Sequence, residues 1–290
     1  MNCDEIFIGI FNKPSCKFIL KGPLKNQAYK LFFYGKDEKV EDLLSKIEGS
    51  CAKSIKSTIR TNNLPNINSE DYLNLRFFTF LQNVKTAEKV RQDEESMYKM
   101  IQKILSFFPE TKDKYKDLTM GFENPAGANV ESMLNNFYMT LDLRCKLLIN
   151  QTSIPFIVSD HPVVRYNQLM EEHTKPGCHT GLATKGLQVF IPISPLLMLA
   201  YYDSKIYKIA NKKDCECVLT NRDDVFQLNG LQFLNTDKNL YFNHQINNSE
   251  ITKLKNTFEK YDSLEKAGIK EYENWRKEDG TTSKIIHGFP

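Results

Sequence analysis

Hydrophobic positions recur at helical spacing through the first half of the chain. An amphipathic helix is predicted by apolar side chains at i, i+3, i+4, i+7 and i+11, namely Val40, Leu43, Leu44, Ile47 and Cys51. Asp37 is an acceptable N-cap, and we expect this helix to begin there and to end before Asn62. A further helix, or a helix that runs into a strand, is predicted from Val130 to Ile149.

Ser69 and the two acids after it predict the start of another helix. Serine is a good N-cap, and acidic side chains favour the positive end of a helix. Apolar positions at helical spacing then continue to about Phe108, where Pro109 stops the pattern. We expect one long helix over this stretch.

The pattern changes near residue 150, where short apolar runs alternate with turn residues. Strands are predicted at 154–159, 187–193, 196–202, 205–210 and 240–242, with earlier short strands within 6–34. No crossover helix fits between the later strands, which favours an antiparallel meander. Helical spacing returns at 223–233 and again, in a charged amphipathic segment, at 250–277.

These elements predict a single α+β domain over residues 1–290. A helical half at about 37–149 is expected to pack on an antiparallel sheet formed mainly by residues 150–245. A C-terminal helix at about 249–278 completes the expected architecture.

Composition and charge narrow the class of protein. Hydrophobic residues make up 41% of the 290 and charged residues 26%, which excludes a disordered or collagen-like chain. The formal net charge of +3 is too small to indicate a broad nucleic-acid-binding surface. Apolar runs are far shorter than the roughly 20 residues of a membrane span, so no membrane association is expected. Acids follow Met1 where a signal peptide needs basic residues, and seven cysteines favour reduced thiols, so a cytoplasmic location is expected.

Four segments of the chain carry recognisable motifs. They are Phe33-Tyr34 before a helix with Glu41 and Glu48, Ser159-Asp-His-Pro-Val163, Phe190-Ile-Pro-Ile-Ser-Pro195, and Asp224-Val-Phe-Gln-Leu-Asn-Gly-Leu-Gln232. Together they resemble a large bacterial family known only as domain of unknown function number 4238, over roughly residues 26–245. The resemblance implies a fold and an association with mobile and defence-related loci, but no reaction.

The chain departs from the family pattern at two places. Family members often begin with a His-x-x-Pro motif that has no match here, and they carry an Arg-Thr step where this chain has Lys85-Thr86. If either motif is catalytic in relatives, this chain is a divergent or inactive member.

Asp160 and His161 follow a predicted apolar strand and precede Pro162, which restricts His161 to an extended conformation. Strand ends present side chains rigidly, so Asp160 could ligate a metal and His161 could serve as a ligand or a general base. The alternative is that Asp160 caps a turn by accepting hydrogen bonds from main-chain amides.

Glu41 and Glu48 are seven residues apart and therefore share one helix face. Paired acids in a concave site can hold Mg²⁺ or Mn²⁺, or act as acid and base. The alternative is a solvated helix face on which these acids pair with neighbouring lysines. A zinc site is not expected, because the candidate ligands have poor spacing: His173, Cys178, His179, Cys215 and Cys217.

These residues lead to two hypotheses for function. The first is a metal-dependent hydrolase, nuclease-like or nucleotide-cleaving, in a defence-type system. In it, Glu48 and Asp160 hold Mg²⁺ or Mn²⁺, His161 is a base or ligand, and Glu41 has a secondary role. The second is a non-catalytic binding or regulatory subunit, or a sensor, with a protein partner from the same operon.

Overall fold

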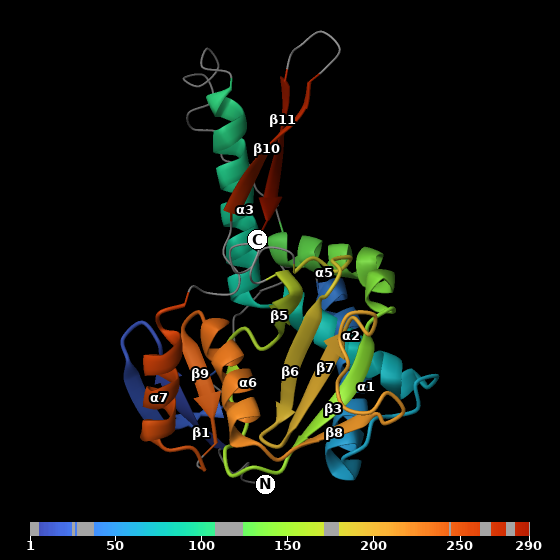
Figure 1. Ribbon diagram of the computed structural model, residues 1–290, viewed down its shortest axis with the longest axis vertical. Helices are drawn as coiled ribbons and strands as arrows, with labels where there is room; N and C mark the ends of the chain where they lie inside the picture. The colour runs from blue at the N-terminus through green and yellow to red at the C-terminus, as the bar shows by residue number, and fades with distance from the viewer. Residues whose placement is uncertain are drawn as a thin grey trace.

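The structure, a computed structural model, describes residues 6–24, 27, 38–107, 124–170, 180–243, 245–261, 268–276 and 282–289. Side chains of residues 38–43 and of the last two ranges lie outside that description. The fold is α+β, as the sequence predicts (Figure 1). The predicted motif Phe33-Tyr34 and the predicted cap Asp37 lie outside the described residues.

In the described part of the chain, two strands come first, four α-helices follow, and most of the remaining elements are strands. The helices are α1 (Glu38–Thr61), α2 (Glu70–Val84), α3 (Ala87–Ser106), α5 (Pro125–Asn136), α6 (Arg222–Leu234) and α7 (Asn248–Phe258), with 3₁₀ turns at Phe137–Thr140 and Gln168–Met170. The strands are β1 (Phe7–Asn12), β2 (Lys17–Pro23), β3 (Arg144–Asn150), β4 (Val158–Ser159), β5 (Val164–Tyr166), β6 (Gln188–Ser194), β7 (Leu197–Tyr202), β8 (Glu216–Leu219), β9 (Asn239–Phe242), β10 (Gly268–Arg276) and β11 (Thr282–Phe289).

The strands described form two main sheets and a hairpin. One sheet has the order β2-β1-β9-β4 and the other β5-β6-β7-β3-β8, while β10 pairs with β11. The larger sheet is mixed, because β8 pairs with β3 in parallel, with Leu148 opposite Cys217. The prediction of a purely antiparallel sheet is therefore wrong at this edge. The connection that makes the parallel pair possible runs from β3 through β4–β7 before β8 returns beside it.

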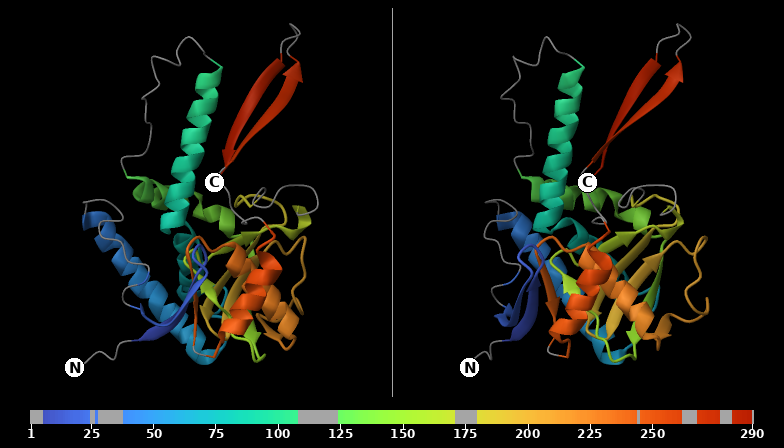
Figure 2. Two further views of the ribbon diagram at one scale, coloured as in Figure 1. Left: turned by 90° about the vertical axis from the view of Figure 1, so that its left-hand side faces the viewer. Right: turned by 60° about the vertical axis from the view of Figure 1, so that its left-hand side comes forward.

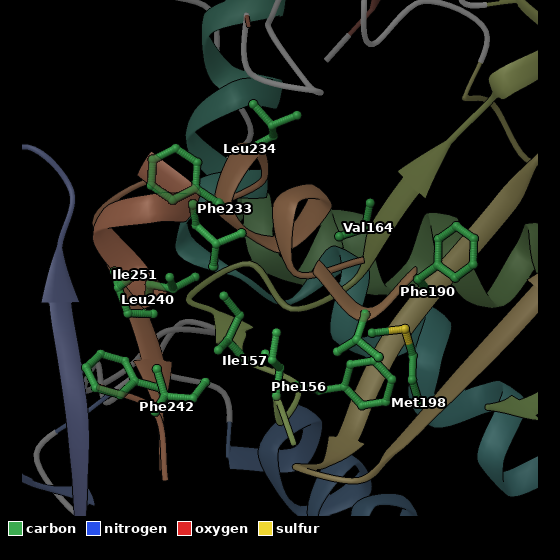
Figure 3. Close-up of a cluster of buried hydrophobic side chains, with 14 of the residues drawn as sticks. Phe156, Ile157, Val164, Phe190, Met198, Phe233, Leu234, Leu240, Phe242 and Ile251 are labelled. Carbon is green, nitrogen blue, oxygen red and sulfur yellow. The ribbon is translucent and has the colours of Figure 1, made fainter. Parts of the chain in front are cut away.

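The larger sheet is covered on both faces. Side chains alternate between the faces of a strand. On β3, Leu147 packs in the core on the side of α1, α2 and α5, whereas Leu148 packs in the core on the side of α6 and α7. Figure 3 shows the second core, in which Phe156 and Met198 lie near one another and Phe233 lies nearer the smaller sheet. The smaller sheet joins this second core through residues such as Phe242.

The distal part of α3 projects from the body of the molecule beside the β10–β11 hairpin (Figures 1 and 2). The C-terminal helix predicted at about 249–278 is confirmed only as far as Phe258, where α7 ends. The prediction is wrong for residues 268–276, which form the strand β10. Gly268 is a poor helix residue, and the aromatic residues Tyr272 and Trp275 favour a strand. This strand obtains its hydrogen bonds from β11 in antiparallel pairing.

Two other predicted elements differ in the structure, and hydrogen bonds close in the chain explain the differences. Residues 205–210 do not form a strand, because Asp203 accepts hydrogen bonds from the main-chain N–H of Lys205 through its side chain and from that of Tyr207 through its carbonyl, which makes a turn. The long helix predicted from Ser69 to Phe108 is divided in two at Lys85 and Thr86. The stretch from Val130 to Ile149 is a helix running into a strand, which is one of the two predicted alternatives.

Candidate functional site

A cavity of about 980 Å³ lies between the two sheets and the junction of α2 with α3. We call it the signature cavity. Its walls are residues 156–160 and 162, 192–195, 85–88, 237–239 and 241–243, with Ile8, Leu24, Gln27 and Gln82. Its volume falls in the upper part of the range for small-molecule sites, which is about 300–1,000 Å³. Two of the four sequence motifs, Ser-Asp-His-Pro-Val and Pro-Ile-Ser-Pro, therefore line one cavity.

Three amide side chains, two on α6 and one at its C-cap residue Asn235, hold the Ser-Asp-His-Pro-Val segment in place. Asn229 accepts from the N–H of Ile157 (3.1 Å) and donates to the carbonyl of Pro155 (2.9 Å). Gln232 accepts from the N–H of Ser159 (3.0 Å) and donates to the carbonyl of Pro162 (2.9 Å), and Asn235 donates to the carbonyls of His161 and Val163. Because these amides are three residues apart, they share one helix face and satisfy a non-helical stretch of main chain along its length.

Asp160 closes the turn before β9. Its Oδ1 accepts from the N–H of Asp237 (3.0 Å), and its Oδ2 accepts from those of Lys238 (2.8 Å) and Asn239 (2.9 Å). The structure thus shows the turn cap that the sequence left open as the alternative. Asp160 also lines the signature cavity, so its use as a metal ligand stays a prediction.

His161 is buried behind the cavity wall, with 1% of its surface exposed. Its Nδ1 lies 2.6 Å from the hydroxyl of Thr86, which does line the cavity. Thr86 is also the N-cap of α3 and accepts from the N–H of Lys89 at 3.2 Å. His161 is therefore linked to the cavity by its contact with the Thr86 hydroxyl.

Glu48 lies on α1 and reaches the cavity through an ion pair. Its Oε1 accepts from the Nζ of Lys85 at 2.5 Å, and Lys85 lines the cavity. Glu41 lies seven residues earlier in α1, and its side chain is outside the described residues. Lys85 and Thr86 thus bind two of the predicted site residues, Glu48 and His161.

Three further charged residues at the cavity were not predicted as site residues from the sequence: Glu88, Arg91 and Asp237. Glu88 and Asp237 line the cavity, and both contact the Nη2 atom of Arg91, at 2.6 Å and 3.7 Å. Glu88 also accepts from Gln92 at 2.8 Å. The spacing of Glu88 and Arg91 is a visible i, i+3 signal, whereas no motif marks Asp237.

The pKa values of the two carboxyl groups are shifted in opposite directions. Burial would raise the pKa of Glu88, but hydrogen bonds from Arg91 and Gln92 outweigh it and hold that pKa below its usual value. The pKa of Asp237 is raised by burial and by the negative charges of Glu88 and Asp160. The end of the cavity near Asp237 therefore holds these three carboxyl groups, and the positive charges of Arg91 and Lys238 partly offset them.

The family model described as "Protein of unknown function (DUF4238)" matches residues 4–245. The chain belongs to the DUF4238 family. Every residue that lines the signature cavity, from Ile8 to Asn243, lies within the match, whereas the β10–β11 hairpin lies outside it. No curated protein and no solved structure matched the chain.

Within this DUF4238 chain, the described residues include no group of three or more His, Cys, Asp or Glu side chains suited to hold a metal ion. Of the candidate zinc ligands, Cys215 and Cys217 are free thiols, and His173, Cys178 and His179 lie outside the described residues. Among the helices that the structure describes, none is long and apolar enough to span a bilayer.

Proposed function

We propose that this DUF4238 protein is a hydrolase that cleaves a nucleotide-sized substrate bound in the signature cavity. The observation that carries the proposal is that three predicted site residues meet the same cavity: Asp160 lines it, Glu48 contacts its lining residue Lys85, and His161 contacts its lining residue Thr86. Titratable groups that converge on a cavity are the usual sign of a catalytic site.

The chemistry of the walls favours a ligand with an aromatic body and an anionic end. Phe156, Tyr241 and Phe242 give part of the wall an apolar and aromatic surface, on which a base could stack. Lys85 and Lys238 also line the cavity and could pair with phosphate oxygens. A nucleotide combines both features, and the cavity has the volume of a small-molecule site rather than of a duplex groove.

Dependence on Mg²⁺ or Mn²⁺ belongs to this proposal. Mg²⁺ is usually held by one or two carboxylates together with substrate phosphates and water, so it does not require a cluster of protein ligands. Asp160 is the best placed carboxylate, because its Oδ1 accepts a single hydrogen bond from the main chain and keeps a lone pair. Glu48 would have to leave Lys85 to join it.

The test is a turnover assay of the purified full chain against ribonucleotides, deoxyribonucleotides and short RNA and DNA, with Mg²⁺, Mn²⁺ or EDTA. We expect hydrolysis of a mononucleotide or dinucleotide. Lys85→Met should raise KM by about tenfold or more if Lys85 binds phosphate, since a charged hydrogen bond contributes about 1.5–3 kcal/mol. Lys46→Met, an exposed lysine on α1, is the matched control. Absence of turnover for every substrate and metal would overturn the catalytic proposal.

A non-catalytic binding module or sensor is the second candidate. It is favoured by the engagement of both Asp160 oxygens with main-chain amides, which gives that residue a structural role. This candidate predicts saturable nucleotide binding by calorimetry without turnover. A defence-type setting and a protein partner from the same operon are proposals common to both candidates, and co-purification of the chain with its operon neighbours tests them.

A further inference from the structure

We propose that the hydroxyl of Thr86 is the nucleophile of the signature cavity and that His161 is its general base, so that a phosphoester is cleaved through a covalent phosphothreonine intermediate. This inference rests on the proposed hydrolase and names its reacting group. It assigns to Thr86 a role beyond that of a helix cap.

The geometry of the pair is that of an activated hydroxyl. Thr86 Oγ1 lies 2.6 Å from His161 Nδ1, within the range for a nucleophile and its base. The same oxygen accepts from the N–H of Lys89, so its own proton is directed to His161 when Nδ1 is unprotonated. The main chain at His161 is fixed in place, because its carbonyl accepts from Ser159 Oγ and Asn235 Nδ2, both at 2.6 Å.

The surroundings suit an attack on phosphorus. Thr86 lines the cavity while His161 is buried, so the hydroxyl meets the substrate and the base is shielded from bulk water. Lys85 is the neighbouring residue and also lines the cavity, where it can pair with phosphate oxygens. Thr86 also stands at the positive end of α3, a helix of 20 residues, which favours negative charge that develops nearby.

The proposed steps balance. Thr86 Oγ forms a bond to phosphorus as its proton passes to His161, and the bond from phosphorus to the leaving oxygen breaks. The leaving oxygen departs on the side of phosphorus opposite Thr86 and takes its proton from a water molecule, which becomes hydroxide, while His161 keeps the proton of Thr86. In the second step that hydroxide attacks phosphorus, the bond from phosphorus to Thr86 Oγ breaks, and His161 donates its proton to Thr86 Oγ, which regenerates the hydroxyl and the neutral imidazole.

A purely structural Thr86 can be distinguished from a nucleophile by choosing replacements that are themselves good helix caps. Asparagine and serine both cap helices as well as threonine or better, but only serine retains a hydroxyl. Thr86→Asn should therefore fold and be inactive, whereas Thr86→Ser should fold and remain active. Ser69→Asn is the matched control, because Ser69 caps α2 by the same type of bond to Tyr72 and does not line the cavity.

The probe is bis(p-nitrophenyl) phosphate, followed by nitrophenolate release and by mass spectrometry of acid-quenched, digested protein. We expect a p-nitrophenyl phosphoryl group on the peptide that contains Thr86. Turnover should fall at least about 100-fold in Thr86→Asn and in His161→Asn, which is the lower end of the effect of losing a nucleophile or base. Melting temperatures from circular dichroism identify any variant that is inactive because it is unfolded.

Each outcome decides the question. Turnover by Thr86→Asn at the wild-type rate, or an adduct on a different residue, would overturn the role of Thr86 and leave the hydrolase proposal intact. Wild-type protein that turns over neither this diester nor any nucleotide would overturn both. An inactive Thr86→Asn with an active Ser69→Asn and an adduct on Thr86 supports the assignment.

Discussion

Gln232 offers the sharpest test of how α6 shapes the signature cavity. The side chain is 0% exposed, accepts from the N–H of Ser159 and donates to the carbonyl of Pro162. Gln232→Met preserves length and approximate volume but removes both bonds. The Ser159 hydroxyl, which also reaches Gln232, keeps the carbonyl of His161 as a partner, so two main-chain groups lose their partners.

The expected loss follows from those two groups. Leaving a buried donor or acceptor unsatisfied costs about 1–3 kcal/mol, so Gln232→Met should lower the free energy of unfolding by about 2–6 kcal/mol. That is a large part of the roughly 5–15 kcal/mol that stabilises a typical domain. The assay is urea denaturation followed by circular dichroism, with the midpoint compared at a common slope.

Gln227→Met is the matched control, because Gln227 lies on the same helix but is exposed. It should change the free energy of unfolding by no more than about 0.5 kcal/mol, because surface substitutions usually have effects of that size. If both variants unfolded at the same urea concentration, the α6 amides would not be holding the Ser-Asp-His-Pro-Val segment, and our account of the cavity wall would be wrong.

Four further substitutions concern charged groups and use the same denaturation assay. Asp160→Asn should destabilise the protein by about 1–3 kcal/mol, because one amide oxygen replaces two charged acceptors of main-chain N–H groups, and an unchanged midpoint would argue against the turn cap. Lys146→Met should also destabilise the protein by about 1–3 kcal/mol, because the buried ammonium group donates to two main-chain carbonyls, those of Asn211 and Asp214. Hydrogen exchange of the main-chain amides in that loop should become faster. Unchanged exchange rates would argue against these two hydrogen bonds. Asp237→Asn should stabilise the protein at neutral pH, because a raised carboxyl pKa means that stability is lost as the pH rises through it, and the gain should vanish in acid. Glu88→Gln should do the opposite, because the lowered pKa of Glu88 contributes stability above the unfolded pKa that is lost as the pH falls; two variants with shifts of the same sign would refute this assignment.

Local patterns in the sequence predicted the elements that depend on local interactions. The stripe that includes Leu44 and Cys51 lies on α1, and both side chains are buried. Asp160 does follow a strand, as its local signals predict, but only Val158 and Ser159 of the strand predicted at 154–159 form it. Elements of this kind are set by periodicity and by capping residues close in the chain.

Long-range pairing could not be predicted in the same way. β1 pairs with β9, so that Phe11 lies opposite Leu240, and no local pattern specifies a partner at that distance. The parallel pairing of β8 with β3 is of the same kind. Asp237 enters the candidate site only because these pairings place the turn before β9 beside the start of α3, where Arg91 contacts it.

The most informative error is the unbroken helix predicted across Lys85 and Thr86. In a continuous helix the first turn after Thr86 would satisfy its N–H groups internally, and the Thr86 hydroxyl would have no cap to make. The break lets Thr86 accept from Lys89 and approach His161, while Lys85 ends α2 and binds Glu48. Predictions from local sequence preference are expected to fail mainly at functional sites, where the structure departs from that preference. The break therefore supports the junction of α2 and α3 as a functional feature. Thr86→Ala, which removes both the cap and the hydroxyl, should lose activity more completely than Thr86→Ser even where both fold, and equal activities would show that the junction serves only to turn the chain.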